Sequence, residues 1–171
     1  MFSRRQFLVA SGGLGAAALV IGVLPKFAAS SALVSDASAA EVFEVTHSDS
    51  EWRAMLSAEQ YEILREEGTE RAYSSPLNNE HRRGLFKCAG CAWPVFSSND
   101  KFDSGTGWPS FTRPYDKRSI ATRSDRSLFM ARTEVHCASC GGHLGHVFND
   151  GPAPTGLRYC MNGVAMGFQT A

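Results

Sequence analysis

Short apolar runs separated by turn-forming residues dominate the chain from Gly84 onward. They include Leu85-Phe86, Val95-Phe96 and the run over residues 127–135, with Gly, Pro, Asn and Asp between them. Short runs bounded by turn residues are typical of antiparallel strands. The intervening segments are too short for the crossover helices that a parallel sheet requires. The pattern therefore predicts a mainly β domain.

Two short helices are predicted ahead of this β region. In the first, Trp52, Met55 and Leu56 lie at helical spacing, and Asp49 or Ser50 is suited to cap the start of the helix. We expect this helix to pack on the domain rather than to carry chemistry.

The second helix is predicted to follow at once. Residues 57–60 fit a capping box, Tyr61 and Leu64 share one helical face, and Gly68 is a natural terminator. The polar stretch over residues 71–83 contains a proline and has no periodicity, so we expect a loop there.

The N-terminal segment has the pattern of an export signal. Arg4-Arg5 precedes an apolar stretch from Phe7 to Leu24 that is rich in Gly and Ala, and residues 3–8 are similar to a twin-arginine signal. Ala37-Ser38-Ala39 offers a small-residue cleavage site. The twin-arginine route implies export of a protein that is already folded.

These features predict a signal peptide over residues 1–39 and a domain over residues 40–171. Cleavage near residues 28–30 and an uncleaved N-terminal anchor are the alternatives. In each case the domain is expected outside the cytoplasm, and in the periplasm if the host is Gram-negative.

The charge balance disfavours nucleic acid as a partner. The 171 residues carry 17 basic and 17 acidic side chains, and 43% of them are hydrophobic. Without residues 1–39 there remain 14 basic and 16 acidic residues, a net charge of −2. Binding to phosphates needs clustered Lys and Arg. The sequence also has no Gly-rich phosphate loop between a strand and a helix, so nucleotide binding is not indicated.

Four of the five cysteines form two Cys-x-x-Cys pairs. The pairs are Cys88 with Cys91 and Cys137 with Cys140, and 45 residues separate them. Two such pairs can complete a tetrahedral zinc site, and four thiolates leave no position for a water. The predicted Zn²⁺, one per chain, is therefore structural. Redox dithiols or disulfides are the alternative. His136 could replace a sulfur, but we expect it at the surface or behind the ligands.

Cys160 is the remaining thiol, and the strand pattern around it separates two faces. Leu157, Tyr159 and Met161 alternate with Arg158, Cys160 and Asn162. The first three are expected in the core and the second three in a site. A cation and an amide beside the thiol favour the nucleophilic thiolate. A buried, inert cysteine is the alternative.

Two histidines follow the second cysteine pair and could supply acid–base chemistry. Strand alternation places His146 with Leu144 and Phe148, and puts His143 on the opposite face unless Gly145 introduces a bulge. His146 is therefore the favoured catalytic histidine. Alternatively, both histidines support the neighbouring metal ligands or lie at the surface.

A Gly- and Pro-shaped turn presents two aromatic residues, Trp108 and Phe111, in the segment 105–111. They are suited either to the core or to the wall of an apolar pocket.

Taken together, these motifs closely resemble the B-type peptide methionine sulfoxide reductases. The resemblance covers residues 51–163. It rests on Glu51-Trp52, Thr69-Glu70, both cysteine pairs, residues 101–111, residues 143–148, Asp150-Gly151-Pro152 and residues 155–162. It implies a β-sandwich-like fold, reduction of the R epimer of protein-bound methionine sulfoxide, zinc held by the four paired cysteines, and Cys160 as the catalytic cysteine.

The resemblance and the chemistry of a sulfoxide suggest a role for each site residue. Cys160 attacks the sulfur and becomes a sulfenic acid, while His146 protonates the oxygen. His143 and Asn162 are expected to orient the oxygen and the acid. Trp108, with Phe148, is expected to receive the substrate methyl group. Arg158 is expected to contact the substrate beside the thiol.

One position departs from the pattern of many relatives. They carry a second, resolving cysteine where this chain has Thr106. We therefore expect a single-cysteine cycle in which a thioredoxin-like or small-thiol reductant reacts directly with oxidised Cys160. Resolution by a cysteine of the zinc site is the alternative.

The expected partners are oxidised proteins, that reductant and the twin-arginine export machinery, and the chain is expected to be a monomer. Two rival functions are a noncatalytic zinc-dependent binding module and a thiol hydrolase using Cys160 with His146. Neither accounts for the full ordered set of motifs.

Overall fold

The computed structural model describes residues 41–126 and 131–171. The predicted signal peptide lies outside these residues, as do positions 127–130 of the apolar run over residues 127–135. Within the described ranges, no helix has the length and the apolar character that crossing a membrane requires.

Both predicted helices are present, and each begins with a capping box. Helix α1 spans Asp49–Met55 and α2 spans Ala58–Glu66. The cap of α1 is Ser48 rather than the predicted Asp49 or Ser50, because Ser48 and Glu51 exchange backbone and side-chain hydrogen bonds. Trp52 and Leu56 are buried as expected, whereas Met55 is exposed.

Helix α2 confirms the predicted capping box and ends at Glu66, two residues before the predicted terminator Gly68. Ser57 and Gln60 form two reciprocal hydrogen bonds of 3.1 Å. Glu67 takes the left-handed conformation at the end of the helix, and the N–H of Gly68 then donates to the carbonyl of Glu62. The following loop contains one 3-10 turn, η1 (Pro76–Asn79).

All strand pairs are antiparallel, which confirms the predicted fold class. The strands form two sheets, one in the order β2-β1-β9 and one in the order β3-β4-β8-β7-β6-β5. Their bounds are β1 (Gly84–Cys88), β2 (Pro94–Ser97), β3 (Lys101–Phe102), β4 (Ser110–Phe111), β5 (Ile120–Asp125), β6 (Arg132–Cys137), β7 (His143–Phe148), β8 (Arg158–Met161) and β9 (Met166–Thr170). Short 3-10 turns lie at η2 (Ser98–Asp100) and η4 (Gly163–Ala165).

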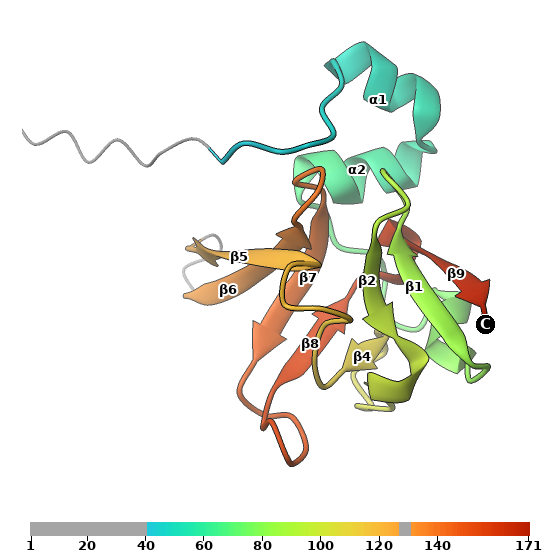
Figure 1. Ribbon diagram of the computed structural model, residues 1–171, viewed down its shortest axis with the longest axis vertical. Coiled ribbons are helices and arrows are strands. Elements are labelled where there is room, and N and C mark those ends of the chain that lie inside the picture. The colour runs from blue at the N-terminus through green and yellow to red at the C-terminus, as the bar shows by residue number, and fades with distance from the viewer. Residues whose placement is uncertain (1–40, 127–130) are drawn as a thin grey trace, which may run out of the picture. The chain divides into compact units, whose positions relative to one another are not determined.

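Three phenylalanines join the two sheets in a common core. Phe86 of β1, Phe96 of β2 and Phe111 of β4 are fully buried. The rings of Phe96 and Phe111 stack at 4.4 Å, and Phe86 meets Phe111 edge-on at 4.9 Å. Helix α2 packs against β7 and η4, and Figure 1 shows both helices at one end of the two sheets.

The segment ahead of α1 is fixed to the hairpin between β6 and β7. The N–H of Val45 donates to the carbonyl of Ser139 at 2.9 Å. Phe43 meets His136 edge-on, and the Glu41 carboxylate lies 3.2 Å from His136 Nε2. His136 is fully buried, so the surface alternative for it was wrong, whereas a position behind the cysteine ligands stays a prediction.

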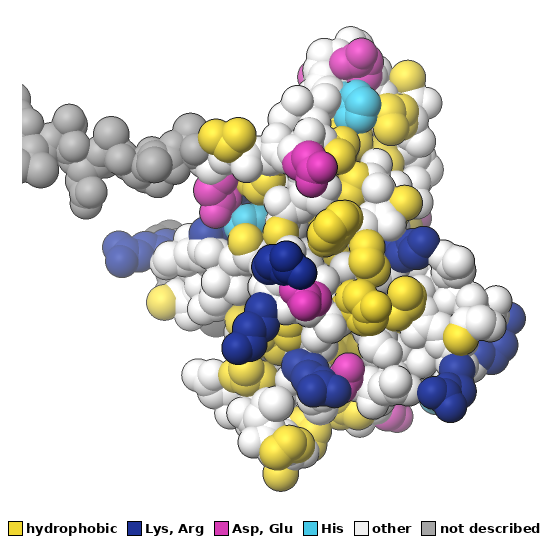
Figure 2. Space-filling view, viewed as in Figure 1, with side chains coloured by type: hydrophobic (Ala, Val, Ile, Leu, Met, Phe, Trp, Pro, Cys, Tyr) yellow, Lys and Arg dark blue, Asp and Glu magenta, His cyan; other side chains and the backbone are white. Residues whose placement is uncertain are grey.

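On the face of the molecule shown in Figure 2, the basic side chains do not form a continuous patch. Figure 2 shows Lys and Arg separated by apolar and uncharged surface, with acidic side chains among them.

Candidate active site and metal site

The two Cys-x-x-Cys pairs lie at the tips of two hairpins, one from each sheet. Cys88 ends β1 and Cys137 ends β6. The two turns are alike. The N–H of Ala92 donates to the Cys88 carbonyl and that of Gly141 to the Cys137 carbonyl, both at 2.8 Å. Ala92 and Gly141 also share the left-handed conformation, with φ of 59° and 70°.

These turns gather four thiols at one place. All four sulfur atoms lie within 4.8 Å of one another, and none forms a disulfide. The Sγ atoms of Cys88 and Cys140 are 3.7 Å apart, and those of Cys91 and Cys137 are 3.5 Å apart. Sulfurs that bind one tetrahedral zinc ion at about 2.3 Å lie about 3.8 Å from one another. The predicted cluster is therefore present and fits a metal ion of this kind.

Hydrogen bonds among the four thiols shift their protons unevenly. Hydrogen bonds from Cys137 lower the pKa of both Cys91 and Cys140, whereas hydrogen bonds from Cys137 raise the pKa of Cys88 and those from Cys140 raise the pKa of Cys137. Thiolate is the form of cysteine that binds a metal, so a metal bound by all four would have to displace the protons of Cys88 and Cys137.

Cys160 lies in the middle of the six-stranded sheet. In the ladder between β7 and β8 it pairs with His146, and on its other side it pairs with Ser110 of β4. Directly opposed residues in such a ladder have neighbouring side chains. The register of the sheet therefore places the thiol beside an imidazole.

A bulge in β7 brings the second histidine to the same place. Val135 pairs with Gly145, whereas the next residue, His136, pairs with His143, so Leu144 is the extra residue. Leu144 enters the core, and the rings of His143 and His146 lie 5.3 Å apart. Strand alternation predicted that His143 and His146 lie on opposite faces unless a bulge forms at Gly145. The structure contains a bulge beside Gly145, so the two histidines lie together.

A cavity of about 130 Å³ lies over this part of the sheet. Its walls are Thr69, Trp108, Arg132, Gly145, His146, Phe148, Cys160 and Asn162. Trp108, His146, Phe148, Cys160 and Asn162 were predicted as site residues. His143 and Arg158 were also predicted but are not among the lining residues. A neighbouring cavity of about 150 Å³ shares Trp108 and contains no cysteine.

Glu70 holds two walls of the cavity in place. The indole N–H of Trp108 donates to the Glu70 carbonyl at 3.1 Å, and the Glu70 N–H donates to Asn162 Oδ1 at 3.0 Å. The buried Glu70 carboxylate accepts from the N–H groups of Gly163 and Val164 at 2.7 and 2.8 Å. Burial raises the pKa of Glu70, and these two hydrogen bonds oppose the rise. One residue thus connects the aromatic wall to the end of β8.

The immediate surroundings of Cys160 are polar on one side and cationic on the other. Thr106 Oγ1 lies 3.7 Å from Cys160 Sγ. Arg158 donates two hydrogen bonds to Asp150, at 2.9 and 2.8 Å, and its guanidinium lies 4.4 Å from the centre of the Phe148 ring. The hydrogen bond to Asp150 raises the pKa of Arg158. Arg158 therefore holds Phe148, a cavity residue, without lining the cavity itself.

His146 is fixed by an acidic partner on β5. Its Nε2 lies 2.8 Å from Asp125, which also accepts from Arg132 at 2.7 Å. Burial lowers the pKa of His146, and the hydrogen bond to Asp125 acts in the opposite direction. The ring is thus held in one orientation with its charged form disfavoured.

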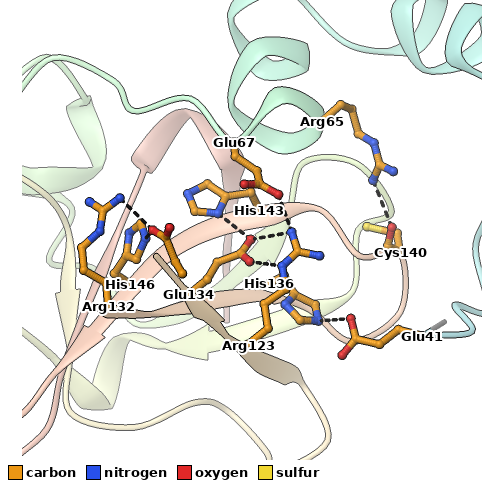
Figure 3. A network of polar contacts seen from close by, with 11 residues as sticks. Glu41, Arg65, Glu67, Arg123, Arg132, Glu134, His136, Cys140, His143 and His146 are labelled. Carbon is orange, nitrogen blue, oxygen red and sulfur yellow. Dashed lines mark hydrogen bonds and ion pairs between the residues drawn. The ribbon is translucent and has the colours of Figure 1, made fainter. Parts of the chain in front are cut away.

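His143 is fixed by a different carboxylate, on β6. Its Nδ1 lies 2.7 Å from Glu134, which also binds Arg123, and Arg123 in turn binds Glu67. Figure 3 shows the Glu134 carboxylate directed at both His143 and Arg123. Each histidine is therefore paired with a different carboxylate, His146 with Asp125 and His143 with Glu134.

Comparison with known proteins places this arrangement in a family. A family model described as SelR domain matches residues 56–170. The peptide methionine sulfoxide reductase MsrB of Agrobacterium fabrum is 52% identical over 126 residues, which cover 74% of this chain and 93% of the relative. The chain belongs to the MsrB family.

Two further MsrB proteins show the same extent of similarity. That of Thiobacillus denitrificans is 53% identical over 120 residues, covering 70% of this chain and 91% of the relative. That of Leptospira interrogans is 50% identical over 127 residues, covering 74% and 97%. The predicted resemblance is confirmed, and the chain is an oxidoreductase of the peptide methionine sulfoxide reductase class.

A second family model identifies the start of this MsrB chain. The model of twin-arginine translocation pathway signal sequences matches residues 1–20. This match indicates export by the twin-arginine route, as predicted, with the periplasm as the destination in a Gram-negative host.

Sequence reasoning missed the acids behind the two histidines of this MsrB protein. Asp125 and Glu134 are neighbours of the site only through the pairing of β5, β6 and β7. No local signal was available for Glu134, because the segment over residues 127–135 also holds Arg132 and Thr133. Thr69 and Arg132, which also line the cavity, had no assigned role.

Proposed function

We propose that this protein reduces the R epimer of protein-bound methionine sulfoxide to methionine, with Cys160 as the nucleophile. The observation that carries the proposal is the shared cavity: Cys160, His146 and Trp108 line one small space. A thiol, an acid and an apolar wall are what a sulfoxide sulfur, its oxygen and its methyl group require.

The chemical step exchanges one oxygen between two sulfurs. The Cys160 thiolate attacks the sulfoxide sulfur and forms a sulfur–sulfur bond, and the sulfoxide oxygen takes up one proton. The hydroxyl then moves to the Cys160 sulfur as its bond to the methionine sulfur and the sulfur–sulfur bond break, which releases methionine and leaves Cys160 as a sulfenic acid. The methionine sulfur gains two electrons and the cysteine sulfur loses two.

His146 is the proposed acid. Its Nε2 is occupied by Asp125, so the protonated ring offers its Nδ1–H to the cavity. In this proposal, Asn162 and His143 orient the sulfoxide oxygen and the His146 ring relative to each other. The aromatic walls Trp108 and Phe148 receive the methyl group, so the epimer is selected by the position of that wall relative to the acid. Arg158 supports Phe148 and contacts the substrate at the mouth of the site.

Regeneration proceeds without an internal thiol. Thr106 Oγ1 lies 3.7 Å from Cys160 Sγ, where many relatives are expected to carry a resolving cysteine. A thioredoxin-like or small-thiol reductant therefore attacks the Cys160 sulfenic acid, releases water and forms a mixed disulfide. A second thiol then releases reduced Cys160. The four clustered thiols are reserved for metal.

Zn²⁺ is the ion we propose for the four-thiol cluster. Cys88, Cys91, Cys137 and Cys140 would hold it, and it would supply structural cross-linking between the two sheets. The domain over residues 40–171 acts after removal of residues 1–39, on oxidised proteins outside the cytoplasm, as a monomer.

Reduction of separated epimers tests the proposal. We expect dithiothreitol-driven turnover of the R epimer of a blocked methionine sulfoxide, no turnover of the S epimer, and loss of activity in Cys160→Ser. Acyl transfer from an ester to Cys160 would instead favour a thiol hydrolase. Folded, zinc-loaded protein that reduces neither epimer would favour the binding module.

A disulfide test addresses the single-cysteine cycle. After oxidation with one equivalent of substrate, mass spectrometry should find Cys160 as a sulfenic acid and no intramolecular disulfide to the clustered cysteines. Such a disulfide would contradict the proposed cycle.

A further inference from the structure

Glu134 is a buried acid for which the reaction as proposed has no role. Its side chain is 3% exposed, and it stands on β6 within the six-stranded sheet. A carboxylate is rarely buried to this extent unless it is paired. Both of its oxygens are in use, one by His143 and Arg123 and the other by Arg123 alone.

Glu134 determines which nitrogen of His143 carries the proton. Burial alone would raise the pKa of Glu134, but hydrogen bonds from His143 and Arg123 outweigh burial and lower it. An ionised carboxylate only accepts hydrogen bonds, so the neutral His143 ring must carry its proton on Nδ1. Its Nε2 is then an acceptor, and this buried atom has no hydrogen-bond partner among the described residues.

His143 in turn lies against the proposed acid. The two imidazole rings meet at 5.3 Å and 65°, in an edge-on arrangement. Neither His143 nor Glu134 is among the residues that line the cavity, and Glu134 pairs with the lining residue His146 in the ladder between β6 and β7. Neither side chain therefore forms part of the wall that would bind the substrate methyl group.

We propose that Glu134 is a positioning residue for sulfoxide reduction: it holds His143 with Nδ1 protonated and Nε2 as a buried acceptor beside His146. This inference rests on the proposed function. A change of tautomer would replace the acceptor behind His146 with a donor and release the ring that the acid packs against. The effect belongs to proton delivery rather than to substrate binding.

The chain offers a matched control for this role. Arg123 binds Glu134 on its buried side and Glu67 on its exposed side, at 2.6 Å from Glu67. Figure 3 shows Glu67, Arg123, Glu134 and His143 as one series of contacts. Glu67→Gln therefore alters the same arginine without touching His143. The Glu67 side chain is 61% exposed, so this variant measures what a disturbed Arg123 contributes without the loss of a buried charge.

The experiment compares Glu134→Leu, Glu134→Gln and Glu67→Gln in the full chain. Leucine removes the acceptor, and glutamine leaves one oxygen to serve both Arg123 and His143. We expect kcat for the R sulfoxide to fall roughly 10- to 100-fold in both Glu134 variants, with KM changed less than about twofold. Glu67→Gln should keep the wild-type kcat.

A second readout does not depend on activity. The ¹⁵N NMR shifts of His143, assigned with His143→Gln, should show a protonated Nδ1 and an unprotonated Nε2 in the neutral wild-type ring. In Glu134→Leu the shifts should move toward protonated Nε2. A wild-type ring protonated only on Nε2 would overturn the inference even if the variants fail to fold.

Different results would overturn the role of Glu134 and the proposed sulfoxide reduction. Folded Glu134 variants with wild-type kcat, beside an active wild type, would overturn this inference alone. A wild-type protein that reduces neither epimer would overturn the proposed function, and this inference with it.

Discussion

Functional side chains of this site are oriented by hydrogen bonds to specific partner residues. His146 has Asp125, His143 has Glu134, and Trp108 and Asn162 share Glu70. The alternation around β8 was enough to predict that Cys160 and Asn162 face the cavity and that Met161 enters the core, but Leu157, also predicted there, is not part of the core cluster. No local pattern predicts Asp125 or Glu134 as partners, because the pairing of three strands brings them to the histidines.

The pairing of Asp125 with His146 predicts a pH effect. Burial lowers the pKa of His146 and the Asp125 hydrogen bond partly offsets this, so Asp125→Asn should lower the pKa further. A smaller fraction of the acid is then protonated at any given pH. The limb of kcat/KM that reports His146 should move to lower pH, as measured from about pH 5 to pH 9. A limb that stays in place in the variant would contradict the role of His146.

Glu70 predicts a linked loss of stability and activity. In Glu70→Gln only one of the two N–H groups of Gly163 and Val164 finds an acceptor, and the other meets an amide N–H. We expect destabilisation by about 1–3 kcal/mol in urea unfolding. We also expect lower kcat/KM in the folded variant, since Trp108 and Asn162 both depend on the Glu70 backbone. Unchanged kinetics would show that these walls are held in another way.

At the scale of elements, β7 is the strand on which the site depends. Its bulge turns Leu144 into the core and leaves His143 and His146 beside each other. Gly145 makes this possible, with φ of 154° and a Cβ position only 2.2 Å from the Cys160 carbonyl oxygen. The bulge could be anticipated from a glycine between two histidines, but its presence depends on the contact with β8.

Gly145→Ala is therefore expected to separate β7 from β8. The added methyl group meets backbone at both Cys160 and Met161, which cannot yield as a side chain can. We expect destabilisation of at least about 1–3 kcal/mol and faster reaction of Cys160 with a thiol reagent. Gly167→Ala is the control, because nothing lies within 4 Å of the added carbon there. Equal stability of the two variants would show that β7 tolerates the side chain.

The sequence predicted the classes of the elements better than their ends. Both capping boxes obey local rules, yet α1 begins after Ser48 because Glu51 reaches Ser48 rather than Asp49. The two sheets could not be predicted separately, because their division depends on Phe86, Phe96 and Phe111 packing across them. The surface alternative for His136 was wrong because Glu41 and Phe43, from a distant segment, lie against it.

At the scale of the whole molecule, the four thiols join the tips of two hairpins from different sheets. Removal of the metal from the proposed zinc site should therefore loosen the junction between the sheets. We expect a chelator to lower Tm, with a loss of several kcal/mol of stability. Cys91→Ser should bind less zinc, whereas Cys160→Ser should bind as much as the wild type. Unchanged Tm after complete metal removal would contradict a structural role.

The size of the cavity sets a limit on which oxidised residues are repaired. About 130 Å³ is well below the roughly 300–1,000 Å³ of sites that enclose a drug-sized ligand, so the space admits one side chain and excludes the surrounding chain. With Cys160 as the proposed nucleophile, a methionine sulfoxide must protrude from its own protein to reach it. Oxidised methionines inside folded proteins would wait for local unfolding, and the rate of their repair would report the dynamics of the damaged protein rather than those of the enzyme.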